Sequence, residues 1–538
     1  MTARALMILG TASHVGKSII TVALGRIFSD EGIRVAPFKA QNMSLNSAAT
    51  PDGGEIGRAQ ALQAEACRIA SSVEMNPVLI KPCSDSTSQV VLLGKVWGQV
   101  SAVDYHTQRA DQLFPAVVES YRKLASQYEL VLLEGAGSPA EINLREHDIV
   151  NLRMARAANA ACLLVGDIDR GGVFASLVGT MELLEPGERD LIKGFVINRF
   201  RGDKTLLQPG VEMIERRLRL PCVGVVPYLT DLHLDEEDSV AMEERQRPQP
   251  PRAWKADEDD SPGRKLRVGV IAFPHLSNFT DFDALAAEPS VALAFLRDPA
   301  DIALADVLIL PGTKQTLDDF DWLSSQGFVP QILKHRGRNK LIMGICGGFQ
   351  MLGLGMQDPE GMENNGLPAT REGLKIIGVR TVFQRAKTTR LVAGHVCCEI
   401  LTGHSLAMTT FKGYEIHLGE TRREAGVSEF ARIAGVGEES AAGAERYDGA
   451  VSENGRSFGT YVHGIFDEDR FRHGIIAAAR ASAGLGPAQQ QAWLKSEREA
   501  QLERLANHLR GSLDMEQIRG WIGLGREQLS LTAGHRRS

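Results

Sequence analysis

The sequence predicts an α/β protein of two domains, each built on a mainly parallel sheet. Three observations lead to this prediction. Apolar runs of strand length alternate with helical segments along most of the chain. The first run leads into a glycine-bounded loop, and a later one, at residues 341–345, stops at a cysteine between glycines. Apolar strands separated by helices are typical of parallel sheets covered on both faces, so we expect the N-terminal domain to be a doubly wound sheet of the P-loop type.

Composition narrows the class of protein. The 538 residues are too many for one core and indicate about two to four domains. A hydrophobic content of 43% and a charged content of 24% are ordinary for globular proteins, and a net charge of −7 gives no reason to expect nucleic acid. No apolar run approaches the roughly 20 residues that cross a bilayer, and no signal peptide is evident. We therefore expect a cytoplasmic protein with neither nucleic-acid nor membrane partners.

Two further features bear on organisation. The seven cysteines are scattered without a C-x-x-C pair, so neither a disulfide framework nor a zinc site is indicated. Residues 236–264 hold nine acidic and five basic residues and four prolines, a composition that cannot bury a core. We predict a first domain over residues 1–235, a linker over 236–264, a second domain over 265–485 and a helical tail over 486–538. The tail carries an apolar stripe formed by Trp493, Leu502, Leu505 and Leu509.

Predicted elements of the first domain alternate in type. The strands are expected at residues 5–10, 33–39, 130–134, 161–166, 192–198 and 221–226, with helices around 57–70 and 108–127. The first strand runs into GTASHVGKS, in which Gly10, Thr11, Gly16, Lys17 and Ser18 are candidate nucleotide-binding residues. In such a loop the backbone N–H groups cradle phosphates, the lysine reaches the outer ones and the serine can ligate Mg²⁺. The loop is one residue longer than the usual spacing, and a chance G-K-S before a helix is the alternative.

Polar residues follow several of these strands. Because ligands bind at the carboxyl ends of parallel strands, Lys39, Glu134, Asp169 and Asn198 are candidate site residues. Glu134 suits a Mg²⁺ ligand, although a capping or solvated carboxylate would look the same. Lys39 could neutralise a phosphate or a substrate carboxylate, or could be a surface lysine. Asn198 is a candidate nucleotide-binding residue.

The second domain is organised around Cys346. Strands are predicted at residues 266–273, 305–310 and 341–345, a helix at 317–335, and a more antiparallel part at 394–400, 411–419 and 457–462, with a surface loop at 434–445. Cys346 lies between strand and helix, where Gly344 and Gly348 permit a sharp turn, as in a nucleophile elbow. The following helix N-terminus favours a thiolate. A buried structural cysteine is the alternative. His463, which ends a predicted strand, is the best-placed base.

Several motifs carry a resemblance to a known family. LPGTKQT (310–316), GICGGFQMLG (344–353), GYEIHLG (413–419) and YVHGIFD (461–467) resemble the class I glutamine amidotransferase domain of the cobyric acid synthase family. GTASHVGKS, FKAQNMSLNS, LLEGAGSPAEINL, GDIDRGGVFASLVGT and FVINRFRGD resemble its synthetase half, whose fold is similar to that of dethiobiotin synthetase. The motifs run in order from residue 1 to about residue 480.

The resemblance implies an enzyme with two reaction centres. Cys346 would attack glutamine and His463 would move protons, with the oxyanion held by the backbone N–H groups of Gly312 and Gly347. MgATP would phosphorylate a corrinoid carboxylate, and ammonia would displace phosphate. The family does this at four peripheral carboxylates of adenosylcobyrinic acid a,c-diamide in cobalamin biosynthesis. Asp148 is a candidate for handling the acceptor or ammonia, or is a helix cap.

One position departs from the wider glutaminase pattern. Many glutaminases place a glutamate two residues after the histidine, but this sequence has Ile465 there. We therefore expect a Cys–His dyad, oriented by a backbone group or by a carboxylate elsewhere, with Glu415 and Asp467 as candidates.

Other functions fit parts of the sequence. An amidotransferase for another corrinoid, such as one that forms cobyrinic acid a,c-diamide, would share the architecture. A partitioning ATPase has a similar loop but carries a signature lysine where this chain has Ala12, and it has no use for a Cys–His pair. A regulatory second domain would keep the fold without the chemistry. The number of subunits is left open.

Overall fold

The computed structural model describes the chain with several gaps. It covers residues 3–83, 87–101, 104–105, 109–230, 232, 234, 254, 263–364, 366–400, 406–436 and 445–524. Contacts divide the chain into two compact units: unit 1 holds residues 1–44, 56–235 and 498–538, and unit 2 holds residues 45–55 and 236–497. The domain boundaries predicted from the sequence, at residues 235, 264 and 485, remain predictions. Most of the predicted linker and of the predicted loop at 434–445 lies outside the described residues.

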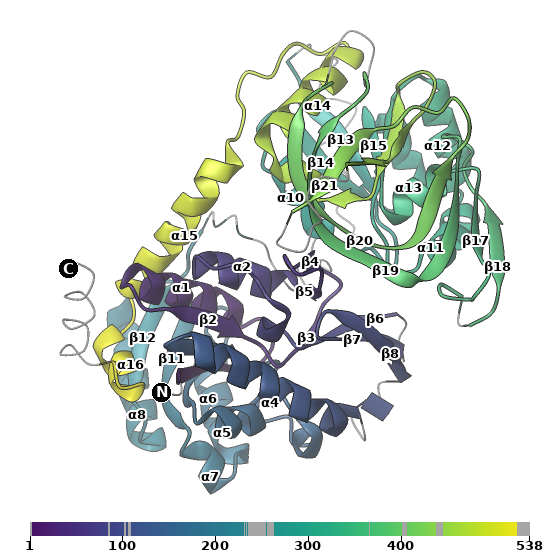
Figure 1. The fold of residues 1–538 in the computed structure, drawn as a ribbon. Helices are drawn as coiled ribbons and strands as arrows, with labels where there is room; N and C mark the ends of the chain where they lie inside the picture. Colours follow the sequence, from purple (N-terminus) through teal and green to yellow (C-terminus); the bar gives the residue numbers. More distant parts are fainter. Residues whose placement is uncertain are drawn as a thin grey trace, which may run out of the picture. The chain divides into compact units, whose positions relative to one another are not determined.

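Unit 1 is built on a six-stranded parallel sheet in the order β12-β11-β10-β1-β9-β2 (Figure 1). The strands are β1 (Arg4–Gly10), β2 (Val35–Phe38), β9 (Leu130–Glu134), β10 (Ala161–Asp167), β11 (Ile192–Phe200) and β12 (Cys222–Pro227). This confirms the predicted parallel α/β fold. Its helices are α1 (Lys17–Asp30), α2 (Arg58–Ala66), α4 (Ala110–Gln127), α5 (Leu152–Ala158), α6 (Val173–Leu183), α7 (Pro186–Arg189), α8 (Lys204–Leu218) and α16 (Met515–Trp521), together with α15 (Leu494–Arg510) from residue 498 onward.

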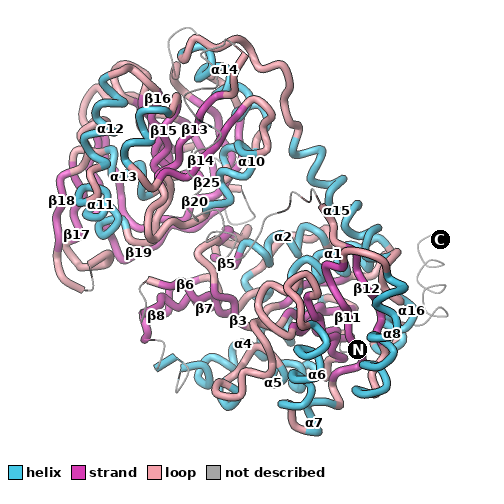
Figure 2. Tube along the Cα trace, turned by 180° about the vertical axis from the view of Figure 1, so that it is seen from behind, coloured by secondary structure: helices cyan, strands magenta, loops and turns pink. Residues whose placement is uncertain are grey.

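Helices cover both faces of this sheet (Figures 1 and 2). Successive residues of a strand point to opposite faces, and the sheet therefore contributes to two apolar cores. Met7 and Leu9 of β1 pack with α4, α5, α6 and α8, whereas Leu6 and Ile8 pack with α1, α2, α15 and α16. Because both faces of the sheet are buried, its strands can be apolar at every position.

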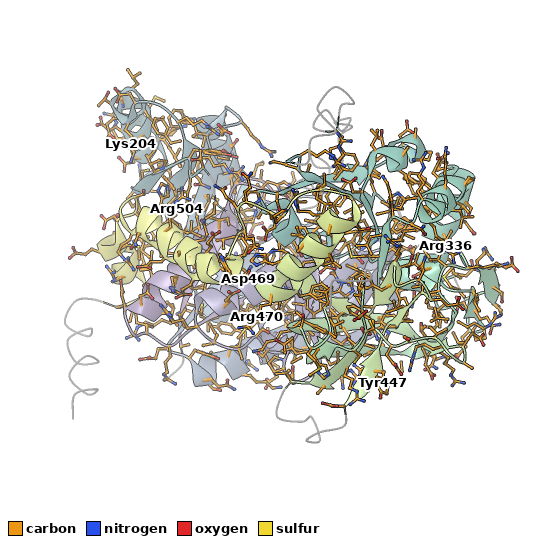
Figure 3. The ribbon with its side chains drawn as sticks, turned by 90° about the horizontal axis from the view of Figure 1, so that it is seen from above. Lys204, Arg336, Tyr447, Asp469, Arg470 and Arg504 are labelled. Atoms are coloured by element: carbon orange, nitrogen blue, oxygen red, sulfur yellow. The ribbon has the colours of Figure 1, made fainter. Side chains whose placement is uncertain are left out.

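The C-terminal tail completes the second of these cores. Leu502, Leu505 and Leu509 of α15 are buried there, which accounts for most of the predicted stripe. Trp493 is not part of it, since 54% of its surface is exposed. Arg504, labelled in Figure 3, lies on α15 and donates to the Thr230 carbonyl oxygen at 2.8 Å.

A second small sheet in unit 1 was absent from the sequence-based prediction. It runs β3-β6-β7-β8, with β3 (Gln41–Met43), β6 (Val78–Pro82), β7 (Thr87–Leu92) and β8 (Lys95–Ser101). Strand β3 pairs in parallel with β6, and the other pairs are antiparallel. A separate two-stranded ribbon joins β4 (Ser47–Ala49) to β5 (Glu55–Gly57).

Unit 2 contains a sheet in the order β14-β13-β15-β16-β24-β23, parallel except for its last pair. Its strands are β13 (Leu266–Ile271), β14 (Val291–Leu296), β15 (Val307–Leu310), β16 (Leu341–Ile345), β23 (Ala450–Val451) and β24 (Ser457–Thr460). Its helices are α10 (Asp283–Ala286), α11 (Thr316–Ser325), α12 (Phe328–Gly337), α13 (Gly347–Leu352) and α14 (Asp469–Ser482). The helix predicted at 317–335 is divided into α11 and α12 because Gly327 adopts φ 80° between them.

A further sheet of unit 2 is mainly antiparallel. Its path is β18-β17-β19-β20-β25, with β21 paired to β19 and β22 paired to β21. The strands are β17 (Gly355–Asp358), β18 (Ala369–Glu372), β19 (Val379–Val396), β20 (Thr410–Arg423), β21 (Ala431–Gly435), β22 (Arg446–Asp448) and β25 (Val462–His463). The single strand predicted at 457–462 is therefore wrong: the chain changes sheet at Tyr461, and His463 belongs to β25, which pairs with β20. Within the described ranges, no helix has the length and apolar character needed to span a membrane.

Candidate active site

Cys346 occupies a strained turn between β16 and α13. Its backbone has φ 51° and ψ −110°, and its side chain is 8% exposed. The turn requires glycine at its neighbours: a Cβ on Gly348 would lie 2.0 Å from the Leu310 carbonyl oxygen, and one on Gly344 would lie 2.7 Å from the backbone nitrogen of Phe349. Glycines therefore let the start of α13 pack directly against β15, and the predicted strand–cysteine–helix turn is present.

His463 lies beside Cys346, whose side chain helps to raise the pKa of the imidazole. The imidazole is 1% exposed, and its backbone pairs with Tyr414 of β20. The Tyr414 ring stacks on the imidazole, with centroids 5.4 Å apart and planes 19° apart. The Cys346 sulfur also contacts the Ile416 carbonyl oxygen at 3.7 Å. Strand β20 thus supports both members of the predicted pair.

A third residue, Asp281, completes this arrangement. Its Oδ2 atom is 2.7 Å from His463 Nδ1, and its Oδ1 accepts from the Gly464 backbone N–H at 2.9 Å. Asp281 lies on a short 3-10 helix, Phe279–Phe282, and is 3% exposed. The expected two-residue arrangement is therefore a Cys–His–Asp arrangement. Glu415 does not provide this bond and instead pairs with Arg390 and Arg446.

Asp281 strongly affects protonation of the histidine. Burial by itself lowers the pKa of His463, but the charge and hydrogen bond of Asp281, together with Cys346, outweigh burial and raise the pKa to about 10. At neutral pH the imidazole is thus held as an imidazolium. A positive charge is therefore held next to the Cys346 sulfur.

Sequence reasoning missed Asp281 because it lies 182 residues before His463. One signal was available. The polar stretch SNFTDFD (277–283) follows β13, and the carboxyl end of a parallel strand is where site residues gather. Since β13 and β16 both flank β15, a residue just after β13 is a reasonable neighbour for one just after β16.

The turn at residues 311–313 lies against the histidine. A Cβ on Gly312 would be 2.9 Å from His463 Cε1, so a larger residue would not fit. Asp319 holds this turn by accepting hydrogen bonds from the Thr313 hydroxyl and from the His275 backbone N–H. In the described part of the chain, the backbone N–H groups of Gly312 and Gly347 donate no hydrogen bond. Both predicted oxyanion donors are therefore available to a ligand near Cys346.

The predicted phosphate loop in unit 1 joins β1 directly to α1. Gly16 adopts φ 100° at the start of α1. Asn198 donates from Nδ2 to the Val15 carbonyl oxygen at 2.9 Å, and a Cβ on Gly16 would lie 2.1 Å from that nitrogen. A Cβ on Gly10 would lie 2.6 Å from the Val15 side chain. Asn198 therefore braces the loop from the end of β11.

Lys17 and Thr11 fix the rest of this loop. Lys17 is 7% exposed and donates from Nζ to the carbonyl oxygens of Ala12 and Gly137, at 2.9 and 3.0 Å. The Thr11 backbone N–H donates to the Val165 carbonyl oxygen at 2.9 Å. The loop is thus tied to β10, and the lysine ammonium is held over it.

Glu134, at the end of β9, gathers three donors from separate elements. The Ser18 hydroxyl donates at 2.8 Å, Lys39 Nζ donates at 3.0 Å, and Gln63 of α2 donates from its amide. Burial raises the pKa of Glu134, but the Lys39 charge and these hydrogen bonds outweigh burial and keep the pKa below its usual value. The carboxylate is therefore ionised. Gln63 was not among the residues predicted from the sequence.

These residues fit a magnesium ion. A hydroxyl and a carboxylate in mutual contact, Ser18 and Glu134, supply the oxygen ligands that Mg²⁺ takes beside nucleotide phosphates. Among the described residues, no group of three His, Cys, Asp or Glu side chains is arranged to hold a metal. A site formed by protein and phosphate oxygens together is the arrangement that this donor set allows.

Two further predicted residues lie apart from this cluster. Asp148 Oδ1 accepts from the backbone N–H groups of Val150 and Asn151, at 2.8 and 3.1 Å, directly before α5. Asp169 Oδ1 accepts from Arg201 Nε at 3.0 Å. Neither is hydrogen-bonded to Glu134 in the described structure.

Comparison with known proteins agrees with this division of the chain. Residues 6–240 match the CobQ/CobB/MinD/ParA nucleotide binding domain, and residues 267–471 match the CobB/CobQ-like glutamine amidotransferase domain. The cobyric acid synthase of Sorangium cellulosum (strain So ce56) is 45% identical over 98% of this chain and 100% of its own length. Those of Pelotomaculum thermopropionicum and Klebsiella pneumoniae (strain 342) are 43% and 44% identical, over 97% and 96% of this chain and 97% of each relative. With this identity along nearly its whole length, the chain belongs to the cobyric acid synthase family.

Proposed function

We propose that the protein is an ATP- and glutamine-dependent amide ligase that converts four peripheral carboxylates of adenosylcobyrinic acid a,c-diamide into amides. The product is adenosylcobyric acid, an intermediate of cobalamin biosynthesis, and the proposed location is the cytoplasm. The observation that chiefly supports this is the presence in one chain of a Cys–His–Asp arrangement and a phosphate loop that ends beside a buried carboxylate.

Unit 2 is proposed to release ammonia from glutamine. The Cys346 thiolate attacks the side-chain carbonyl carbon, and the oxyanion accepts hydrogen bonds from the N–H groups of Gly312 and Gly347. His463 donates its proton to the departing nitrogen, so that ammonia leaves and a thioester remains. His463 then takes a proton from water, which hydrolyses the thioester to glutamate. Asp281 fixes the imidazole and stabilises its positive charge during these transfers.

Unit 1 is proposed to activate the acceptor. A substrate carboxylate oxygen attacks the γ-phosphorus of ATP, and ADP leaves. Ammonia then attacks the acyl phosphate carbon, and phosphate leaves, giving the amide. The phosphate loop and Lys17 bind the phosphates, and Lys39 offsets negative charge next to Glu134.

Other groups of unit 1 are assigned more limited roles. Ser18 and Glu134 would hold Mg²⁺, which when bound neutralises phosphate oxygens. We further propose that Asp148 handles the acceptor or ammonia and that Asp169 handles phosphate or substrate. Their observed hydrogen bonds, to the turn before α5 and to Arg201, would orient them for these roles.

The test is direct incubation of the purified protein with MgATP, glutamine and adenosylcobyrinic acid a,c-diamide, followed by mass spectrometry of the corrinoid. The proposal predicts a product carrying four additional amides. Amidation of cobyrinic acid at the a and c positions instead would assign the chain to the neighbouring corrinoid reaction. No amidation of any corrinoid would contradict the proposal.

A further inference from the structure

Residues 45–55 belong to the N-terminal half of the sequence but to unit 2 of the structure. We call this segment the strap. It contains β4, the loop Thr50–Gly54, in which the Gly54 backbone N–H donates to the Thr50 hydroxyl at 2.9 Å, and the first residue of β5. Both strands are buried at every position, so the strap is an integral part of the packing of unit 2.

The first contact of the strap leads to the catalytic histidine. The Ser47 backbone N–H donates to Asn278 Oδ1 at 3.0 Å. Asn278 adopts the left-handed conformation, φ 51° and ψ 44°, and its carbonyl oxygen accepts from the Asp281 backbone N–H at 3.0 Å. Asp281 in turn holds His463. Ser47, Asn278 and Asp281 are each at most 3% exposed, so these hydrogen bonds are shielded from water and hold their geometry.

Other contacts of the strap reach strands β19 and β20. Ala49 packs in a small apolar cluster with Tyr414, Ile416 and Leu391. Tyr414 stacks on His463, and the Ile416 carbonyl oxygen contacts the Cys346 sulfur. Through Tyr414 and Ile416, the strap therefore also supports His463 and Cys346 by a route that does not pass through Asn278.

The far end of the strap is fixed by a buried ion pair. Lys387 Nζ of β19 bonds Glu55 Oε2, and the Glu55 side chain is fully buried while that of Lys387 is 14% exposed. Breaking such a pair leaves a buried charge without its partner, so the end of the strap cannot easily leave this position.

The chain segments on either side of the strap carry residues that contact Glu134. Lys39 precedes the strap along the chain and Gln63 follows it, and both donate to Glu134. Asn42, just before the strap, donates to Gln60 of α2 at 2.9 Å. A shift of these residues when a nucleotide or carboxylate binds at Glu134 would be passed along the covalent chain to Ser47 and Glu55.

We propose that the strap is a positioning element of the glutaminase centre, with Ser47 and Asn278 acting on His463 through Asp281. It ties the alignment of the base to the segment that bears Lys39 and Gln63, so that glutamine hydrolysis responds to ligands at Glu134. This inference rests on the proposed function, because it assumes that both centres are active.

The test uses the full-length protein and two Asn→Gly variants. Asn278→Gly removes the acceptor of the Ser47 N–H but tolerates the left-handed backbone. Asn339→Gly is the matched control, because Asn339 is also left-handed, at φ 56°, and is exposed. Asn278→Asp keeps the acceptor oxygen and serves as the conservative variant. Glutamate release is measured with and without MgATP and the a,c-diamide, and amidation is measured separately with ammonium chloride.

We expect ligands at unit 1 to stimulate glutamate release in the wild type, in Asn339→Gly and in Asn278→Asp. In Asn278→Gly the kcat for glutamine should fall by about ten- to a hundredfold, the cost of misplacing a catalytic group, and stimulation should be lost. Its ammonium-dependent amidation should equal that of the wild type. A second variant, Lys387→Met, frees the other end of the strap and should also lose stimulation.

The results that would overturn the role of the strap differ from the result that would overturn the proposed function of unit 2. Wild-type stimulation in both Asn278→Gly and Lys387→Met would overturn the role of the strap. The role of the strap would also be overturned if Asn278→Gly lost ammonium-dependent amidation to the same extent as glutamine hydrolysis. The residue would then matter only for folding. If the wild type amidates with ammonium but releases no glutamate from glutamine, the proposed function of unit 2 is wrong, whatever the variants do.

Discussion

The two reaction centres use a buried carboxylate in different ways. In unit 1, Glu134 accepts hydrogen bonds from a lysine, a serine and a glutamine, and its charge holds these groups together at the end of β9. In unit 2, Asp281 is devoted to one base, with one oxygen on the imidazole of His463 and the other on the next backbone N–H. One carboxylate therefore gathers donors from several elements, and the other holds a single imidazole and its neighbouring backbone.

Because the two carboxylates contact different groups, we expect substitutions to abolish glutamine hydrolysis and ATP-dependent amidation separately. Changes at Asp281 or Cys346 should affect glutamine hydrolysis and spare ATP-dependent amidation with free ammonia. Changes at Glu134 should affect ATP-dependent amidation and spare the glutamine hydrolysis that is measured without ligands of unit 1.

The largest effect is expected for Cys346→Ser. A serine hydroxyl in place of the thiolate is a far weaker nucleophile at neutral pH, so glutamine hydrolysis should fall by at least about a thousandfold. Glutamate release measures this directly. Hydrolysis at the wild-type rate would remove Cys346 from the mechanism.

Asp281→Asn should reduce kcat for glutamine by about 10²- to 10⁴-fold, since the amide neither holds the correct tautomer nor stabilises the imidazolium. The pKa of His463, raised to about 10 in the wild type, should fall, and the basic limb of the kcat/KM profile should move to lower pH. The matched control is Asp321→Asn, which breaks a half-exposed pair with Arg371 and should leave the profile unchanged. An unshifted basic limb in Asp281→Asn would contradict the assignment.

The same bond has a consequence for stability. Because the pKa of His463 is raised on folding from 6.5, its contribution to stability is complete below pH 6.5 and is lost as pH rises through about 10. Asp281→Asn should therefore lose stability most at pH 6 and least near pH 10. Denaturant unfolding at both pH values measures the difference.

Glu134→Gln tests the other centre. Lys39 would be left buried without its ionic partner, which costs about 3–5 kcal/mol, and ATP-dependent amidation should fall by about a hundredfold or more. Glutamine hydrolysis in the absence of ATP should persist. The double variant Glu134→Gln/Lys39→Met should regain much of the stability but not the activity. Recovery of both would mean that the pair is structural only.

The smallest effect concerns the turn at Cys346. In Gly348→Ala the new Cβ would meet the Leu310 carbonyl oxygen, and the variant should lose about 1–3 kcal/mol of stability. Gly337→Ala, where a Cβ meets nothing within 4 Å, should change stability by less than about 1 kcal/mol. Equal unfolding midpoints would show that the turn tolerates a side chain.

Sequence reasoning succeeded where the chemistry is local. The residues from Gly10 to Ser18 are contiguous, and their spacing alone indicates a loop that binds phosphate. Cys346 is flanked by the glycines that its turn requires. Alternating strands and helices are likewise visible in the hydrophobic pattern, because each element carries its own period.

It failed where contacts are distant in sequence. No pattern near His463 points to Asp281, and the apolar run at 457–462 does not reveal that the chain changes sheet at Tyr461. At this point the Tyr461 hydroxyl is hydrogen-bonded to Thr421 of β20 and to Gln350 of α13, both of which are also distant in sequence. The contacts of the strap could not be predicted for the same reason, because its partners lie more than two hundred residues away in sequence.

The central claim is that nitrogen is released in one centre and joined to an activated carboxylate in another. Its most direct test is mass spectrometry of the corrinoid formed by Cys346→Ser with MgATP and either glutamine or ammonium chloride. We expect four amidations with ammonium and none with glutamine. Amidation from glutamine by this variant, or no amidation from ammonium by a folded variant that still binds ATP, would contradict it.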